Sequence, residues 1–276
     1  EETDAMFQIL CDRNNMELAH IDQQLMIERR KAMKPISDIV HKKRWVLLEY
    51  PTELAANNAG MSLEAWEDFV FKACITDWEQ AGKEQDVLKK IMEATKEVRL
   101  VADGTDLLVN IANIPAVKCC GKRNMPDGEV FTAPNKTMVN GEILFNTPTM
   151  YMNKSFNWIK LVFKDGKVIE TDSDNKKDLD EILDTDAGAR YVGEFAFGTN
   201  KNIQLPVKSI LFDEKIGGSN HMALGKCYED ASNGNDSAIH WDMILRHKEA
   251  NGKVYMDGVL VQENGIWLHE DMKNFN

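Results

Sequence analysis

The chain has 276 residues, of which 43% are hydrophobic and 28% are charged, and its formal net charge is −12. This composition is typical of a globular protein with a sizeable core and excludes the strongly basic character of most nucleic-acid-binding proteins. The sequence shows neither a signal peptide nor an apolar run near the roughly 18 residues of a membrane span, so we expect no membrane partner.

The cysteine content predicts a reducing compartment. There are five cysteines, an odd number, and none of them forms a Cys-x-x-Cys pair. This pattern favours free thiols in a cytoplasmic protein over a disulfide framework or a thiolate zinc site.

The first third of the chain is predicted to be helical and α/β. Helical spacing of apolar residues predicts a long helix over residues 3–34, which ends before Pro35. The apolar run 44–50 predicts a buried strand, and Ser62 is a candidate cap for a helix that continues to about Trp78. A further helix over 85–96 and a strand over 98–102 follow.

From about residue 97 the pattern changes to short β-type runs separated by glycine-containing turn signals, with one helix near residues 177–184. The predicted fold class is therefore α+β with mixed α/β character. We expect a helical and α/β segment over residues 1–96 that packs on a β-rich, metal-binding catalytic region over residues 97–276.

The most informative short motif is His240 and Asp242, which lie two residues apart in an apolar run. In a strand, alternate side chains share a face, so these two would point one way while Trp241 and Met243 point into the core. An imidazole beside a carboxylate on a rigid strand suits a divalent cation.

Four further polar residues stand in apolar or glycine-rich surroundings. Glu129 follows a Pro-Asp-Gly turn signal, and Glu194 lies in an aromatic run where an unpaired carboxylate would be costly. His221 lies between glycines in a segment that we predict to be a loop, and Tyr228 could point back at the same site. The structural alternatives are an exposed strand residue for Glu129 and ordinary packing for His221 and Tyr228.

Together the candidates offer three carboxylates and two imidazoles, a set that suits two divalent ions about 3.5–4 Å apart with a bridging carboxylate and water. The sequence has no His-Glu-x-x-His motif, no Gly-x-Ser-x-Gly elbow and no phosphate-binding loop that ends in Lys-Ser or Lys-Thr. The proposed metal ligands are Glu129, Glu194, His221, His240 and Asp242.

Several segments also carry a resemblance. They are Asn124-Met-Pro-Asp-Gly-Glu-Val-Phe-Thr-Ala-Pro134, Tyr191-Val-Gly-Glu194, Leu211-Phe-Asp-Glu-Lys-Ile-Gly-Gly218, His221-Met-Ala-Leu-Gly225 with Tyr228, and Ser237-Ala-Ile-His-Trp-Asp242. In this order they resemble the thermophilic metallo-aminopeptidase family, which includes aminopeptidases T and S.

The resemblance implies a dinuclear zinc, cobalt or magnesium centre held by the five ligands above, with Glu194 as the bridging carboxylate and Tyr228 as an active-site tyrosine. It implies a homodimeric hydrolase that removes N-terminal residues from peptides with a free N-terminus. Members of that family carry an additional N-terminal α/β domain, which we expect to be absent from this chain.

Two other functional hypotheses for these ligands remain. The same ligands could serve another two-metal hydrolase, such as an amidohydrolase or a phosphatase, although no basic pocket for phosphate accompanies them. The chain could also be a catalytically incomplete metal-binding fragment. For Glu214 and Lys215 two alternatives remain, a contribution to catalysis and a structural ion pair.

Overall fold

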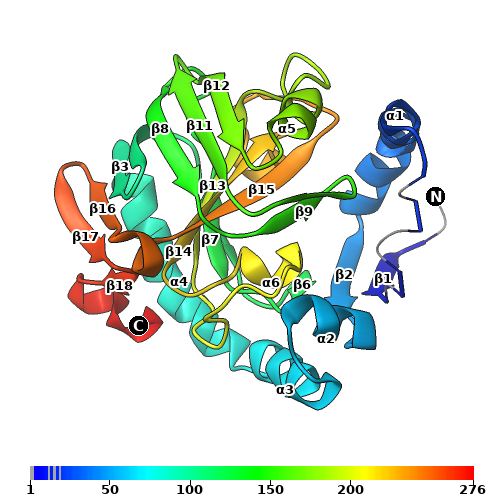
Figure 1. The fold of residues 1–276 in the computed structure, drawn as a ribbon. Helices are drawn as coiled ribbons and strands as arrows, with labels where there is room; N and C mark the ends of the chain where they lie inside the picture. The colour runs from blue at the N-terminus through cyan, green and yellow to red at the C-terminus, as the bar shows by residue number, and fades with distance from the viewer. Residues whose placement is uncertain (1–2, 12, 15–16, 19) are drawn as a thin grey trace.

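The computed structural model describes residues 3–11, 13–14, 17–18 and 20–276, and it has the mixed α+β fold that the sequence predicts (Figure 1). Two sheets dominate this described part. The larger contains, in spatial order, β12 (Lys167–Ser173), β11 (Ile159–Lys164), β8 (Val139–Phe145), β4 (Thr105–Asn110), β3 (Glu97–Ala102), β16 (Lys253–Met256), β17 (Val259–Glu263) and β18 (Ile266–Trp267).

The second sheet carries the candidate ligands and is antiparallel throughout. Its spatial order is β15 (His240–Arg246), β14 (Ser219–Gly225), β13 (Val192–Gly198), β7 (Glu129–Thr132) and β5 (Val117–Cys119). We call it the five-stranded sheet.

The main hydrophobic core includes side chains from both large sheets. Leu100 and Phe163 of the larger sheet belong to the same buried cluster as Phe195 and Trp241 of the five-stranded sheet. Because side chains alternate along a strand, the residues between these apolar ones are directed to the other face of the five-stranded sheet. That other face is where the candidate ligands lie.

The N-terminal elements form a separate layer (Figure 1). A parallel sheet pairs β1 (Ala5–Leu10), β2 (Arg44–Glu49) and β6 (Asn124–Met125), so it takes one strand from beyond residue 97. The layer also contains the helices α1 (Gln23–His41), α2 (Glu53–Ala59) and α3 (Leu63–Cys74). The helix α4 (Trp78–Ala94) packs instead on β5 and β7 of the five-stranded sheet, and its Leu88 and Met92 belong to the main hydrophobic core.

The remaining elements connect the sheets. They are the hairpin β9 (Thr149–Tyr151) and β10 (Lys154–Phe156), the helices α5 (Lys176–Leu183) and α6 (Ile210–Asp213), and the 3₁₀ segments η1 (Glu229–Ala231), η2 (His247–Ala250) and η3 (Glu270–Phe275). The helix predicted near 177–184 and the strands predicted over 44–50 and 98–102 are confirmed.

The predicted helix over residues 3–34 is wrong, although residues 12, 15–16 and 19 within it lie outside the described part of the chain. Residues 5–10 form β1, which pairs in parallel with β2, and α1 begins only at Gln23. A short apolar run fits a strand as well as a helix, and the available partner strand decides. Pro35 lies inside α1 and does not end it.

Helix caps were predicted better than helix ends. Ser62 caps α3, and its hydroxyl accepts a hydrogen bond from the amide of Ala65 at 3.2 Å. However, α3 ends at Cys74, four residues before the predicted end at Trp78. Asp77 caps the next helix, α4, because its side chain accepts a hydrogen bond from the amide of Gln80 at 2.9 Å. The helix predicted from residue 85 therefore begins seven residues earlier, at Trp78.

A second apolar cluster connects the N-terminal helices to the segment before β14. Trp66 of α3 is fully buried against Phe212 of α6, with ring centroids 5.3 Å apart. This contact positions α6 and therefore the two residues that follow it, Glu214 and Lys215. None of the helices in the described ranges is both long and apolar enough to cross a membrane.

Candidate metal centre

Four adjacent strands of the five-stranded sheet bring the five predicted ligands to one face. Glu129 begins β7, Glu194 lies in β13, His221 lies in β14, and His240 and Asp242 lie in β15. The alternation predicted for β15 places Trp241 in the core and the two ligands on the opposite face.

Small residues stand between the ligands in the register of the sheet. Ala223 of β14 lies directly opposite both Glu194 of β13 and Asp242 of β15. Ala196 of β13 lies opposite His221. Because side chains directly opposite one another are only about 5 Å apart, an alanine at these points leaves space above the sheet for the longer ligand side chains.

The position of Glu194 depends on a β-bulge. The pairing of β13 with β14 shifts between Val192 and Glu194, so Gly193 is an extra residue. A Cβ atom at Gly193 would lie 2.4 Å from the carbonyl oxygen of Gly225, which no larger residue could accept without a backbone movement. Bulges commonly redirect a side chain beside an active site, and this one sets the face on which Glu194 lies.

The carboxylate of Glu194 lies between the two imidazoles. Its Oε1 is 3.7 Å from Nε2 of His221, and its Oε2 is 3.2 Å from Nε2 of His240. Each imidazole has a second carboxylate, since His221 Nε2 is 3.2 Å from Glu129 Oε2 and His240 Nε2 is 3.6 Å from Asp242 Oδ2.

The ligand atoms therefore fall into two groups of three that share Glu194. One group is Glu129, Glu194 and His221, the other is Glu194, His240 and Asp242, and within each the ligand atoms lie within 4.8 Å of one another. A carboxylate shared between two sets of ligands is suited to hold a pair of ions.

Several of these buried atoms have no hydrogen-bond partner. They are Glu129 Oε2, His221 Nε2, His240 Nε2 and Asp242 Oδ1. An unsatisfied buried polar group costs about 1–3 kcal/mol, so four at one place need an explanation. Carboxylate oxygens and imidazole nitrogens that face each other without hydrogen bonds fit divalent cations well.

The ring of His240 is held in the orientation that a metal ligand needs. Its Nδ1 lies 2.7 Å from the carbonyl oxygen of Lys226, to which it would donate its proton. The lone pair is then on Nε2, which faces Glu194 and Asp242. A backbone acceptor of this kind commonly fixes the tautomer of metal-binding histidines.

A fully buried lysine completes the inner side of the site. The Lys215 ammonium donates to Glu129 Oε1 at 2.8 Å and also pairs with Glu214. Burial would lower the pKa of Lys215, but the two carboxylates outweigh burial and hold that pKa well above its usual value. Burial would likewise raise the pKa of Glu129, yet Lys215 and His221 hold it below the usual range.

Glu214 is closer to the ligands than the sequence indicated. One of its carboxylate oxygens lies within 4.8 Å of ligand atoms of both His221 and Asp242. Burial raises the pKa of Glu214 to about 8, and the neighbouring carboxylates of Glu129 and Asp242 add to this shift. The charged triplet Asp213-Glu214-Lys215 after an apolar run was the available signal for this position.

Two residues differ in setting from the sequence interpretation. His221 does not lie in a loop but at the centre of β14, because the turn is made by Gly217 and Gly218 just before the strand. Tyr228 lies at the start of η1, where its ring centroid is 4.8 Å from that of His240, and its side chain is 45% exposed. The structure thus places Tyr228 at the open edge of the ligand set.

Similar proteins were found by sequence. Aminopeptidase PepS of Streptococcus thermophilus is 26% identical over 82% of this chain and 63% of its own length. Aminopeptidase 2 of Geobacillus stearothermophilus is 34% identical over 53% of this chain and 40% of its own length. This chain therefore spans less than two thirds of the length of these relatives.

Two solved structures share the fold. Wild-type AmpT from Thermus thermophilus superposes with a TM-score of 0.82 at 21% identity, covering 96% of this chain and 76% of that one. A 2,5-dihydroxypyridine dioxygenase from Pseudomonas putida KT2440 has a TM-score of 0.65 at 11% identity, covering 97% of this chain and 92% of that one.

The family model described as thermophilic metalloprotease (M29) matches residues 1–267, which is nearly the whole chain. This match agrees with the arrangement of carboxylates and imidazoles on the five-stranded sheet. The chain belongs to the thermophilic metalloprotease family M29.

Proposed function

We propose that this chain is a metal-dependent aminopeptidase, which uses a water activated by two divalent ions to release N-terminal residues from peptides. The observation that carries the proposal is the pair of ligand groups that share Glu194. The reaction class is supported by the family match and by the names of the relatives, which are aminopeptidases.

Two sets of ligands would hold the two ions. Glu129, Glu194 and His221 would hold one ion, and Glu194, His240 and Asp242 the other. Zinc, cobalt or magnesium would supply a Lewis acid for the peptide carbonyl and a water of lowered pKa.

The remaining groups orient and balance these ligands. Lys215 keeps the carboxylate of Glu129 ionised and fixed in place, while the carbonyl of Lys226 holds the ring of His240. The Tyr228 hydroxyl, at the open edge, is proposed to donate a hydrogen bond to the oxygen that becomes negative during attack.

The test is removal and replacement of the metal. Dialysis against a chelator should abolish hydrolysis of leucyl anilide, and zinc, cobalt or magnesium should restore it. Elemental analysis of the restored protein should find about two ions per chain. One ion per chain at full activity would contradict the two-metal mechanism.

The same protein should be assayed on a phosphate ester and on 2,5-dihydroxypyridine, because a fold shared with a dioxygenase does not by itself specify the reaction. Turnover of either compound without peptide hydrolysis would contradict an aminopeptidase. Two bound ions with no turnover of any substrate would identify a catalytically incomplete metal-binding fragment.

We also propose a cytoplasmic homodimer. The five cysteines are all free, which supports a reducing compartment. Large apolar side chains are exposed on β1 and α1, with Phe7 at 64% and Ile36 at 54%, and such residues are enriched where proteins associate. Sedimentation equilibrium should give twice the chain mass, and a monomer at micromolar concentration would contradict the assembly.

A further inference from the structure

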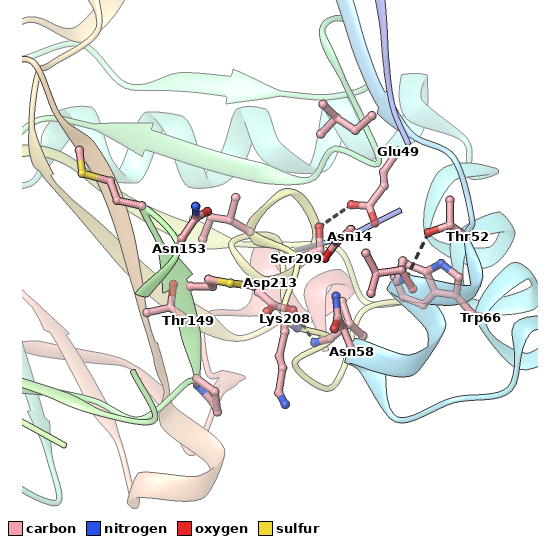
Figure 2. A pocket seen from close by; sticks show the side chains of 18 of the residues that line it. Asn14, Glu49, Thr52, Asn58, Trp66, Thr149, Asn153, Lys208, Ser209 and Asp213 are labelled. Atoms are coloured by element: carbon pink, nitrogen blue, oxygen red, sulfur yellow. Dashed lines mark hydrogen bonds between the residues drawn. The ribbon is translucent and has the colours of Figure 1, made fainter. Parts of the chain in front are cut away.

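A cavity of about 420 Å³ lies between the N-terminal elements and the rest of the chain, and none of the five candidate ligands lines it (Figure 2). One side is formed by the N-terminal layer, with Glu49 at the end of β2, Asn58 in α2 and Trp66 in α3. The other side is formed by Thr149 of β9, by the segment 207–210 that leads into α6, and by Ile244 of β15.

Two lining residues connect the cavity to the neighbourhood of the ligands. Ile244 is the cross-strand partner of His221 and lies two residues beyond Asp242, on the same face of β15. Asp213, which also lines the cavity, directly precedes Glu214. A molecule held over the ligands would therefore lie beside the lining residues Ile244 and Asp213.

The opposite end of the ligand set is open. His240, at the start of β15, is in contact with Tyr228, whose side chain is 45% exposed. An exopeptidase must accept a leaving peptide of any length, so that part of the substrate needs the open side. A partly enclosed cavity of this volume can hold the side chain of the N-terminal residue.

We propose that this cavity binds the side chain of the substrate's N-terminal residue, and that it selects long side chains with a neutral or cationic end over those that end in a carboxylate. The inference rests on the proposed aminopeptidase function, which supplies the peptide and the position of its scissile bond.

The charged side chains that line the cavity would determine which substrate side chains bind. The carboxylates of Glu17 and Glu49 line the cavity, together with Asp213, whose pKa burial raises to about 7. Lys208 is the sole ammonium among the described lining residues. Figure 2 shows Glu49 directed at Ser209, whose hydroxyl donates to Glu49 Oε2 at 2.6 Å, and Lys208 extending away from Glu49. A substrate carboxylate would therefore enter a negative pocket, at a cost, while an ammonium would be stabilised.

The wall is also held in a fixed shape. The backbone amides of Val207 and Lys208 donate to the two carboxylate oxygens of Asp213, at 2.7 and 2.9 Å. Lys208 has a φ of +61°, in the left-handed region that non-glycine residues seldom occupy. Backbone strain retained by surrounding hydrogen bonds is common at ligand-binding walls.

The test compares alanyl, leucyl, lysyl and glutamyl anilides on the metal-loaded full chain. The wild-type kcat/KM for the lysyl and leucyl compounds should exceed that for the glutamyl compound by ~100-fold. Glu49→Gln should lower the lysyl-to-glutamyl ratio by ~10-fold and leave the leucyl-to-alanyl ratio in place.

A second variant addresses size. Ile210 lines the cavity and is 41% exposed, so Ile210→Trp should fold while narrowing the cavity and should lower the leucyl-to-alanyl ratio by ~10-fold. Ile169→Trp, on β12 and 50% exposed, is the matched control and should change neither ratio.

Calorimetric binding of free leucine, lysine and glutamate tests the side-chain pocket separately from the aminopeptidase function. Tighter binding of lysine than glutamate that Glu49→Gln removes would support the pocket even if no anilide were hydrolysed, in which case the aminopeptidase function alone fails. The proposed role of the cavity would be overturned if the three amino acids bound equally tightly. It would also be overturned if each variant changed kcat/KM for all four anilides by the same factor.

Discussion

Replacing Glu194 with glutamine should lower kcat/KM for leucyl anilide by ~10³-fold or more, equivalent to about 4 kcal/mol of transition-state stabilisation. The carboxylate faces both imidazoles, with one oxygen toward each. A glutamine offers one neutral oxygen and an amide group that donates instead of accepting, so neither ion keeps its shared ligand. Activity and ion content should be measured on the same sample.

Two comparisons separate this effect from general damage. Glu170→Gln, at an exposed position of β12, makes the same chemical change away from the site and should leave activity unchanged. Metal-free Glu194→Gln should still unfold in urea in one cooperative transition, although it loses the carboxylate that faces His221 and His240 and helps to hold the pKa of both imidazoles above the usual value. Full activity of Glu194→Gln with both ions bound would remove Glu194 from the proposed mechanism.

The placement of His240 and Asp242 was predictable because a strand imposes it locally. Alternation along β15 fixes the shared face as soon as Trp241 enters the core. The helix start at Ser62 was predictable for a similar reason, since a cap needs only a side chain and an amide three residues later. Such features depend on the chain within a few residues.

Features that depend on distant partners were not predictable. β1 is a strand because β2 lies beside it, and no periodicity within residues 5–10 records that partner. His221 was expected in a loop because the glycines on either side of it are turn signals in isolation, yet β13 and β15 pair with the segment on both edges. Local composition was a weaker signal here than the sheet.

The inner side of the candidate site was the hardest to foresee. Lys215 is charged, and charged residues are seldom buried unless they are paired. Its partners lie on one neighbouring residue, Glu214, and on Glu129, which is far away in sequence. Only the three-dimensional arrangement shows that the lysine is enclosed and that its ammonium is shared between the two carboxylates.

Replacing Lys215 with methionine should lower the free energy of unfolding of the metal-free protein by about 3–5 kcal/mol at neutral pH. Methionine has a similar length but no charge, so the ionised Glu129 would be left buried without its cation, and Glu214, whose pKa burial raises to about 8, would lose a hydrogen-bond donor. Urea unfolding of both proteins gives the difference, with Lys164→Met at an exposed end of β11 as the control.

The dependence on pH identifies the cause of this loss. Lys215 and His221 hold the pKa of Glu129 below its usual range, so the stabilisation of the ionised carboxylate is present above the unfolded-state pKa and disappears as the pH falls through the folded-state value. The difference between wild type and Lys215→Met should therefore be largest near neutrality and shrink below about pH 4. A difference that stays constant with pH would assign the loss to packing of the methionine, and the pairing of Lys215 with Glu129 would then contribute little to stability.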